Sequence, residues 1–115
     1  MATSEDLDDG ITALRSELGA ELENLTPDRQ VMMKAGKLSS LLLARYTRTS
    51  MLEDLNSAIK IDESIIPLLE DDAMRMGMNC NLASKLGRRF ERCRGRQPED
   101  LSRAVQILQL SLIHI

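Results

Sequence analysis

Residues 38–49 read LSSLLLARYTRT, and residues 82–93 read LASKLGRRFERC. When the two segments are aligned at an offset of 44, residues of the same type coincide at positions that recur with helical spacing. The coinciding pairs are Leu38/Leu82, Leu42/Leu86, Arg45/Arg89, Tyr46/Phe90 and Arg48/Arg92. The chain therefore contains an internal repeat, and its apolar positions predict a helix in each copy.

The similarity continues beyond these helices. Residues 53–59 (EDLNSAI) match residues 99–105 (EDLSRAV) at an offset of 46, after a short insertion around Gly95–Pro98. The same start, Glu-Asp-Leu followed by an isoleucine, occurs at residues 5–11. We therefore expect one domain in residues 1–115, made of a half repeat (4–24) and two helical hairpins (27–69 and 73–115).

Local signals give the expected helix ends. The first helix is predicted from Ser4 to Asn24, with Thr3 or Ser4 as the N-cap and its apolar stripe running from Leu7 to Leu22. Thr26-Pro27-Asp28 predicts the next start, with threonine as the cap and proline in the first helical position. Ser50-Met51-Leu52-Glu53 has the form of a capping box, and Pro67 should end or kink the helix that follows.

The last two helices are predicted at about 73–92 and from Pro98 to the end, and no segment alternates with the period of a strand. We expect Leu86, Phe90 and Leu101 to be buried between helices, and Cys80 to be a small core residue. The acid pairs Glu53-Asp54 and Glu99-Asp100 are interpreted as charges that stabilise helix starts.

Leu86-Gly87-x-x-Phe90, followed by Ala104, resembles the Leu-Gly-x-x-Tyr and later small-residue positions of a tetratricopeptide (TPR) hairpin. The complete repeat, with its offset of 44 to 46 residues, is similar to the elongated TPR repeats found in arrays of fungal proteins that also carry a CHAT-type protease or an NTPase domain. The resemblance covers residues 5 to 115. Leu43 departs from it, because it stands where the second copy has Gly87.

The resemblance implies an all-α fold, namely a right-handed α-solenoid of about five helices. If the first helix of each hairpin is called A and the second B, their order along the chain is B-A-B-A-B. The resemblance also implies a scaffold that binds a partner protein along the concave face. The alternative is a non-catalytic sensor or regulatory fragment of a larger CHAT-type protease or NTPase. The residues that would line the groove are Lys37, Ser40, Thr47, Arg48, Asn81, Ser84, Lys85, Arg88 and Arg92.

The charge is distributed unevenly: residues 1–28 hold eight acids and one arginine, whereas residues 85–103 hold seven bases and three acids. Three interpretations of the arginine cluster formed by Arg88, Arg89, Arg92, Arg94 and Arg96 stay open, namely a solvated face, a site for an acidic protein segment and a nucleic-acid site. The scarcity of aromatic residues argues against nucleic acid.

Nothing in the sequence predicts catalysis, a cofactor or a metal. His114 has no clustered partner, the two cysteines form no CxxC, and the phosphate-binding glycine patterns are absent. No basic, apolar leader is seen at the start, and no apolar run reaches the ~18 residues of a membrane span, so we expect a cytoplasmic protein. The apolar final residues, 107–115, also predict self-association through the C-terminal helix.

Overall fold

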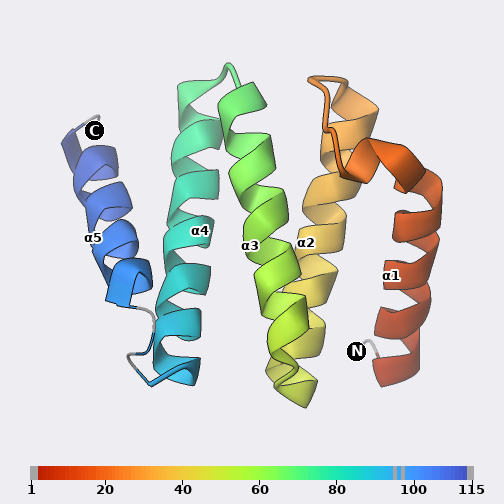
Figure 1. The fold of residues 1–115 in the computed structure, drawn as a ribbon. Helices are drawn as coiled ribbons and strands as arrows, with labels where there is room; N and C mark the ends of the chain where they lie inside the picture. Colours follow the sequence, from red (N-terminus) through yellow and green to blue (C-terminus); the bar gives the residue numbers. More distant parts are fainter. Residues whose placement is uncertain (1–2, 95, 97, 114–115) are drawn as a thin grey trace. The chain divides into compact units, whose positions relative to one another are not determined.

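The computed structural model describes residues 3–94, 96 and 98–113, with side chains as far as Leu110. This part of the chain contains α1 (Ser4–Leu18), η1 (Gly19–Leu22), α2 (Arg29–Thr49), α3 (Leu52–Ile65), η2 (Ile66–Leu68), α4 (Asp72–Arg92) and α5 (Pro98–Ile113) (Figure 1). It contains no strand. The prediction of an all-α protein is therefore confirmed.

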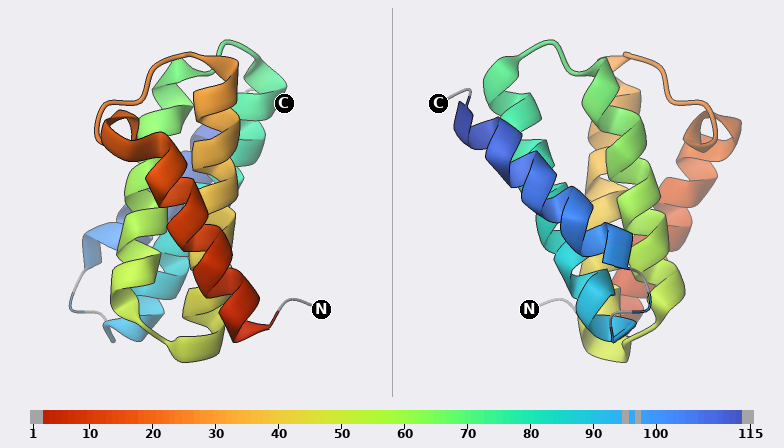
Figure 2. Two further views of the ribbon diagram at one scale, coloured as in Figure 1. Left: turned by 90° about the vertical axis from the view of Figure 1, so that its right-hand side faces the viewer. Right: turned by 60° about the vertical axis from the view of Figure 1, so that its left-hand side comes forward.

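The chain forms two compact units, Met1–Leu68 and Leu69–Ile115. In the first, α1 and α3 both pack against α2 and run antiparallel to it (Figures 1 and 2). In the second, α4 and α5 form an antiparallel hairpin, seen most clearly in the right-hand view of Figure 2.

The core of the first unit is made by the helical stripes that the sequence predicted. Burying aliphatic side chains of this size is the main favourable term in folding, about 1.5–3 kcal/mol for each one removed from water. Polar residues occupy most of the outward positions, as expected for helices with one buried face. The buried apolar residues are Leu7, Ile11, Leu14, Leu18, Ala35, Leu38, Leu42, Leu55, Ala58, Ile59, Ile61 and Ile65.

The second unit has a smaller core, in which α4 supplies Leu82, Ala83 and Leu86 and α5 supplies Ala104. The expected burial of Leu86 is confirmed.

The other two expectations for this unit were less accurate. Phe90 is only half-buried, and the prediction for Leu101 is wrong, because Leu101 is 45% exposed. Asp100 and Ala104 stand about one turn apart on the side of α5 that faces α4, and this register turns Leu101 away from the hairpin.

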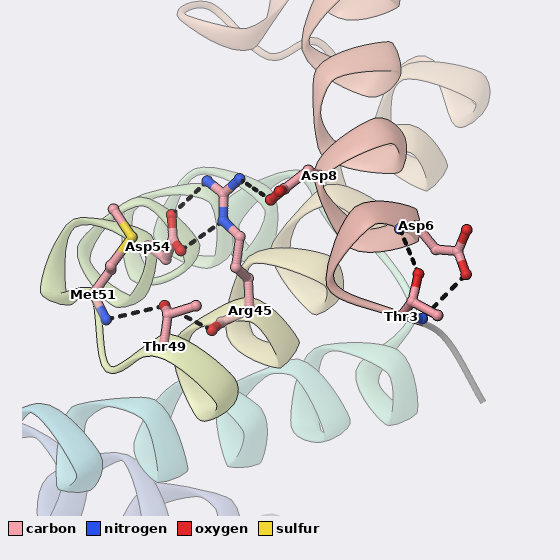
Figure 3. A network of polar contacts seen from close by, with 7 residues as sticks. All are labelled: Thr3, Asp6, Asp8, Arg45, Thr49, Met51 and Asp54. Carbon is pink, nitrogen blue, oxygen red and sulfur yellow. Dashed lines mark hydrogen bonds and ion pairs between the residues drawn. The ribbon is translucent and has the colours of Figure 1, made fainter.

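The start of α1 agrees with the sequence, but its end does not. The Thr3 and Asp6 side chains each accept a hydrogen bond from the other residue's backbone N–H at 3.1 Å, which makes a capping box (Figure 3). The helix ends at Leu18 because Gly19 adopts φ = 51°, a conformation that other residues rarely adopt. Residues up to Leu22 continue as a 3₁₀ turn, so the predicted extension to Asn24 is wrong.

The start of α2 lies two residues later than predicted. Asp28, not Thr26, is the N-cap, and its carboxylate accepts hydrogen bonds from the backbone N–H groups of Gln30 and Val31 at 2.9 and 3.1 Å. Pro27 therefore precedes the cap and is not the first helical residue. An aspartate and a threonine so close together compete for the same role, and the sequence alone did not rank them.

The predicted capping box at Ser50 is not formed. Ser50 lies at φ = 60° and its backbone N–H donates to the carbonyl of Tyr46 at 2.7 Å, so it ends α2. Met51 occupies the N-cap of α3 without a side-chain hydrogen bond. Only two residues connect the helices, and Ser50 must reverse the chain direction. The prediction for Pro67 is confirmed, since α3 ends at Ile65.

Candidate functional site

The residues predicted to meet a partner lie on the outer face of the first helix of each hairpin. On α2, Lys37, Ser40, Thr47 and Arg48 are exposed, and their spacing places them on one face, away from the buried Ala35, Leu38 and Leu42. We call these four residues the α2 face. It carries two positive charges and two hydroxyl groups.

On α4, Asn81, Ser84, Arg88 and Arg92 are exposed and form the corresponding α4 face. Lys85 was expected with them, but it is only 5% exposed and therefore does not belong to this surface. Spacings of four and three residues place Lys85 on the same side of α4 as Asn81 and Arg88, so its burial follows from tertiary packing and not from its position around the helix.

The arginine cluster is divided by the fold. Arg88, Arg92, Arg94 and Arg96 are exposed, whereas Arg89 is half-buried and points into the α4–α5 hairpin, where it pairs with α5. A partner that binds this surface can reach the exposed arginines, but the guanidinium of Arg89 is engaged inside the unit.

Arg89 and Asp100 form a two-pronged ion pair. The Nε and Nη2 groups of Arg89 donate to the two carboxylate oxygens of Asp100, both at 2.7 Å. The Asp100 side chain is almost fully buried. Because two parallel charge-assisted hydrogen bonds fix both distance and orientation, this contact holds the start of α5 in one register against the end of α4.

The first unit contains the same contact. Arg45 of α2 donates through Nε and Nη2 to the two oxygens of Asp54 on α3, both at 2.8 Å (Figure 3). Arg45 and Arg89 are equivalent in the internal repeat, and so are Asp54 and Asp100. We call each pair a clamp. The two hairpins are thus fastened at equivalent positions by identical chemistry.

The acid pairs were interpreted as helix-start charges, and for Asp54 and Asp100 this interpretation is incomplete. Both are within the first turn of a helix, but they are buried, 2% and 3% exposed, and each accepts from an arginine of the preceding helix. The signal was present in the sequence, because Arg45/Arg89 and Asp54/Asp100 recur together. Linking them required knowing that the two helices of a hairpin meet there.

Arg45 also reaches a third helix. Its Nη1 group donates to the carboxylate of Asp8 on α1 at 2.9 Å (Figure 3). The hydrogen bonds to Asp54 and then to Asp8 raise the pKa of Arg45 above its ordinary value. Asp8 is more than half exposed, so water screens this second contact more than the first.

Asp6 occupies the equivalent place in the half repeat, and its partner is Thr3 of the capping box. The hydrogen bond from the Thr3 backbone N–H, and then the one with its side chain, hold the pKa of the Asp6 carboxyl below its ordinary value.

A further polar contact inside the first unit was not predicted. The buried Ser39 hydroxyl lies 2.7 Å from the Asp62 carboxylate and 3.2 Å from the backbone carbonyl of Ala58. The repeat-equivalent positions in the second unit are Ala83 and Leu108, which cannot make this contact. It ties α2 to α3 in the first unit alone.

A small cleft of about 160 Å³ opens in the first unit between the end of α1, α2 and α3. Its inner wall is apolar and its rim is charged. The residues that line it are Arg15, Leu22, Glu23, Leu38, Leu42, Ser57, Lys60, Ile61 and Ser64.

The remaining reactive side chains are dispersed. Cys80 is exposed, which corrects the expectation that it is a core residue, and Cys93 is half-buried; neither forms a disulfide. Met74, on the same helix as Cys80, is also exposed. Among the described residues no three His, Cys, Asp or Glu side chains are grouped so that they could hold a metal ion. His114 lies outside the described residues.

Within the part of the chain that the structure describes, every helix is too short or too polar to cross a bilayer. Comparison with protein-family models, with curated proteins and with solved structures found no match.

Proposed function

We propose that this protein is a non-catalytic interaction module that binds an acidic, extended segment of a partner protein through the α2 face and the α4 face. The observation that carries the proposal is the repetition of the hairpin. The same clamp fastens both hairpins, and in both the first helix leaves a polar face exposed.

The clamps support a binding role because they make each hairpin rigid. A surface whose supporting helices are already fixed loses less conformational entropy when a partner binds. The groups that fix the helices are the buried or half-buried Arg45, Asp54, Arg89 and Asp100. The groups that fix the hairpins are therefore separate from the exposed side chains of the α2 face and the α4 face.

The chemistry of the α4 face favours an acidic ligand. Arg88 and Arg92 are four residues apart, one turn of the helix, and Arg94 and Arg96 follow them. A guanidinium can hold a carboxylate by two hydrogen bonds, and such pairs are stronger than contacts between neutral groups. Asn81 and Ser84 can bond the backbone of an extended peptide.

The proposal includes the resemblance to tetratricopeptide repeats, which the recurring clamp supports, and a right-handed stacking of the hairpins, which rests on that resemblance. It also includes a cytoplasmic location, which the two cysteines without a disulfide favour.

A peptide-binding experiment tests this function. The labelled chain is screened against acidic, neutral and basic extended peptides, and the strongest acidic binder is titrated by fluorescence anisotropy. We expect acidic peptides to be selected. The double variant R88E/R92E reverses two charges of the α4 face. It should weaken binding of the acidic peptide by about tenfold or more, because attraction between the face and the peptide becomes repulsion.

The matched control is R15E with K60E, which changes the net charge by the same amount at two exposed positions on α1 and α3. We expect it to weaken binding by less than about threefold. Equal effects of the two double variants would indicate non-specific attraction and contradict the proposal. A mobility shift of RNA that is lost only in R88E/R92E would favour a nucleic-acid site instead.

A further inference from the structure

One side of α5 is apolar and uncovered. Leu101, Val105 and Leu108 are 45%, 46% and 44% exposed. Spacings of four and three residues place all three on a single stripe of the helix. The adjoining side of α5, with Asp100 and Ala104, packs against α4. We call Leu101, Val105 and Leu108 the α5 stripe.

The same positions of the repeat are buried in α1. Leu7, Ile11 and Leu14 align with the α5 stripe through the shared Glu-Asp-Leu start, and they are 3%, 1% and 8% exposed. The helix that packs along α1 is α2. In the first unit, therefore, another helix covers the residues that are equivalent to the α5 stripe. In the second unit, α4 leaves the α5 stripe exposed.

The surfaces of the chain indicate which helix can cover it. Outside α5, the exposed large apolar residues of the described chain are Met33, Met51 and Met74, which belong to three different segments and form no stripe. The inner side of α2 already contacts α1 and α3. The helix that offers a matching apolar stripe is α5 of a second copy.

The border of the stripe favours the same occupant. Ser102, Gln106 and Gln109 are exposed and carry no charge. When two identical surfaces meet across a two-fold axis, any charge near the axis faces itself, and an uncharged border avoids this repulsion. A head-to-tail contact is less favourable, because the outer side of α1 presents Thr12 and Ser16 and no apolar stripe.

We propose that two copies of this protein associate through the α5 stripe, with the two α5 helices antiparallel about a two-fold axis. The inference is independent of the proposed peptide binding, which uses the α4 face. One pair of helices buries less than a standard protein–protein interface, so the dimer should be weak, forming at high micromolar concentration.

Sedimentation equilibrium over a concentration series tests the proposal. The average mass of the wild type should rise from that of the monomer towards that of the dimer. V105E and V105K should each stay monomeric, because each places like charges at the axis. An equimolar mixture of V105E and V105K should associate again, because the charges then attract.

L110E is the matched control, since Leu110 is also exposed on α5 but lies on a different side from the stripe. It should associate as the wild type does. Circular dichroism should show equal helix content in all variants. Association in the mixture of V105E and V105K would show that each variant alone is monomeric because of charge repulsion and not because it fails to fold. A wild type that stays monomeric, a mass that grows beyond the dimer, or a mixture that stays monomeric would each overturn the two-fold pairing.

Discussion

Arg89 and Asp100 are joined by two hydrogen bonds of 2.7 Å, and Arg45 and Asp54 repeat this geometry at 2.8 Å. Both aspartates are buried, and the hydrogen bonds from the arginine offset the cost of removing each polar side chain from water. The clamp is therefore both a structural fastening and a signature of the repeat.

The first prediction concerns the cost of opening a clamp. R89M should lower the free energy of unfolding by about 3 kcal/mol, because it leaves the Asp100 carboxylate buried without a partner. The double variant R89M/D100L should lose clearly less than the sum of the two single variants. D8N should lose under about 1 kcal/mol, because Asp8 is largely exposed. Urea denaturation measures all four, and additive losses would contradict the coupling.

The second prediction compares two leucines at equivalent positions of the repeat. Leu55 is fully buried, whereas Leu101 is 45% exposed. L55A should cost about 3 kcal/mol of stability, from lost burial and the cavity left behind, and L101A under about 0.5 kcal/mol. Thermal or urea unfolding at low protein concentration is the measurement. A large loss in L101A under those conditions would mean that Leu101 is packed within the monomer.

The third prediction concerns Gly87, the glycine of the Leu-Gly-x-x-Phe motif. A Cβ atom built on Gly87 meets no atom within 4 Å, so the packing of the helices does not require glycine at this position. G87A should stabilise the protein by about 0.5–1 kcal/mol, because alanine favours the helix. G19A should destabilise it, because Gly19 has φ = 51°. Loss of stability in G87A would show that the site is crowded.

The fourth prediction is a titration. The pKa of Asp6 lies below 3.8, since Thr3 hydrogen bonds favour the charged carboxylate. Because the folded-state pKa is the lower one, the stabilisation by Asp6 is complete above pH 3.8 and is lost as the pH falls through the folded-state pKa. NMR titration of the Asp6 carboxyl carbon should give this low midpoint in the wild type.

T3A should move the Asp6 midpoint part of the way back towards 3.8, because it removes the contribution of the Thr3 hydroxyl to the lowered pKa and leaves the larger one, the hydrogen bond from the Thr3 backbone N–H. T12A, an exposed threonine of the same helix, serves as the control and should leave the midpoint unchanged. An unshifted midpoint in T3A would show that the capping box does not set this pKa.

The helices, the internal repeat and the apolar stripes could be predicted from the sequence. These features follow from periodicity and from the local rules of proline and apolar spacing, which act over a few residues. For this reason the break at Pro67 and the buried positions of α1 from Leu7 to Leu18 agreed with prediction. Local signals failed where two neighbours competed for one role, as Thr26 and Asp28 did for the cap of α2.

The environment of the equivalent residues depends on the tertiary structure. Leu55 and Leu101 both follow Glu-Asp in similar local sequences, yet one is buried and the other exposed, because burial depends on whether another helix lies against that side. Asp54 and Asp100 were recognisable as helix-start acids, but their arginine partners lie on the preceding helix. Such a pairing is a contact across space, which the antiparallel packing of each hairpin creates and a local pattern does not encode.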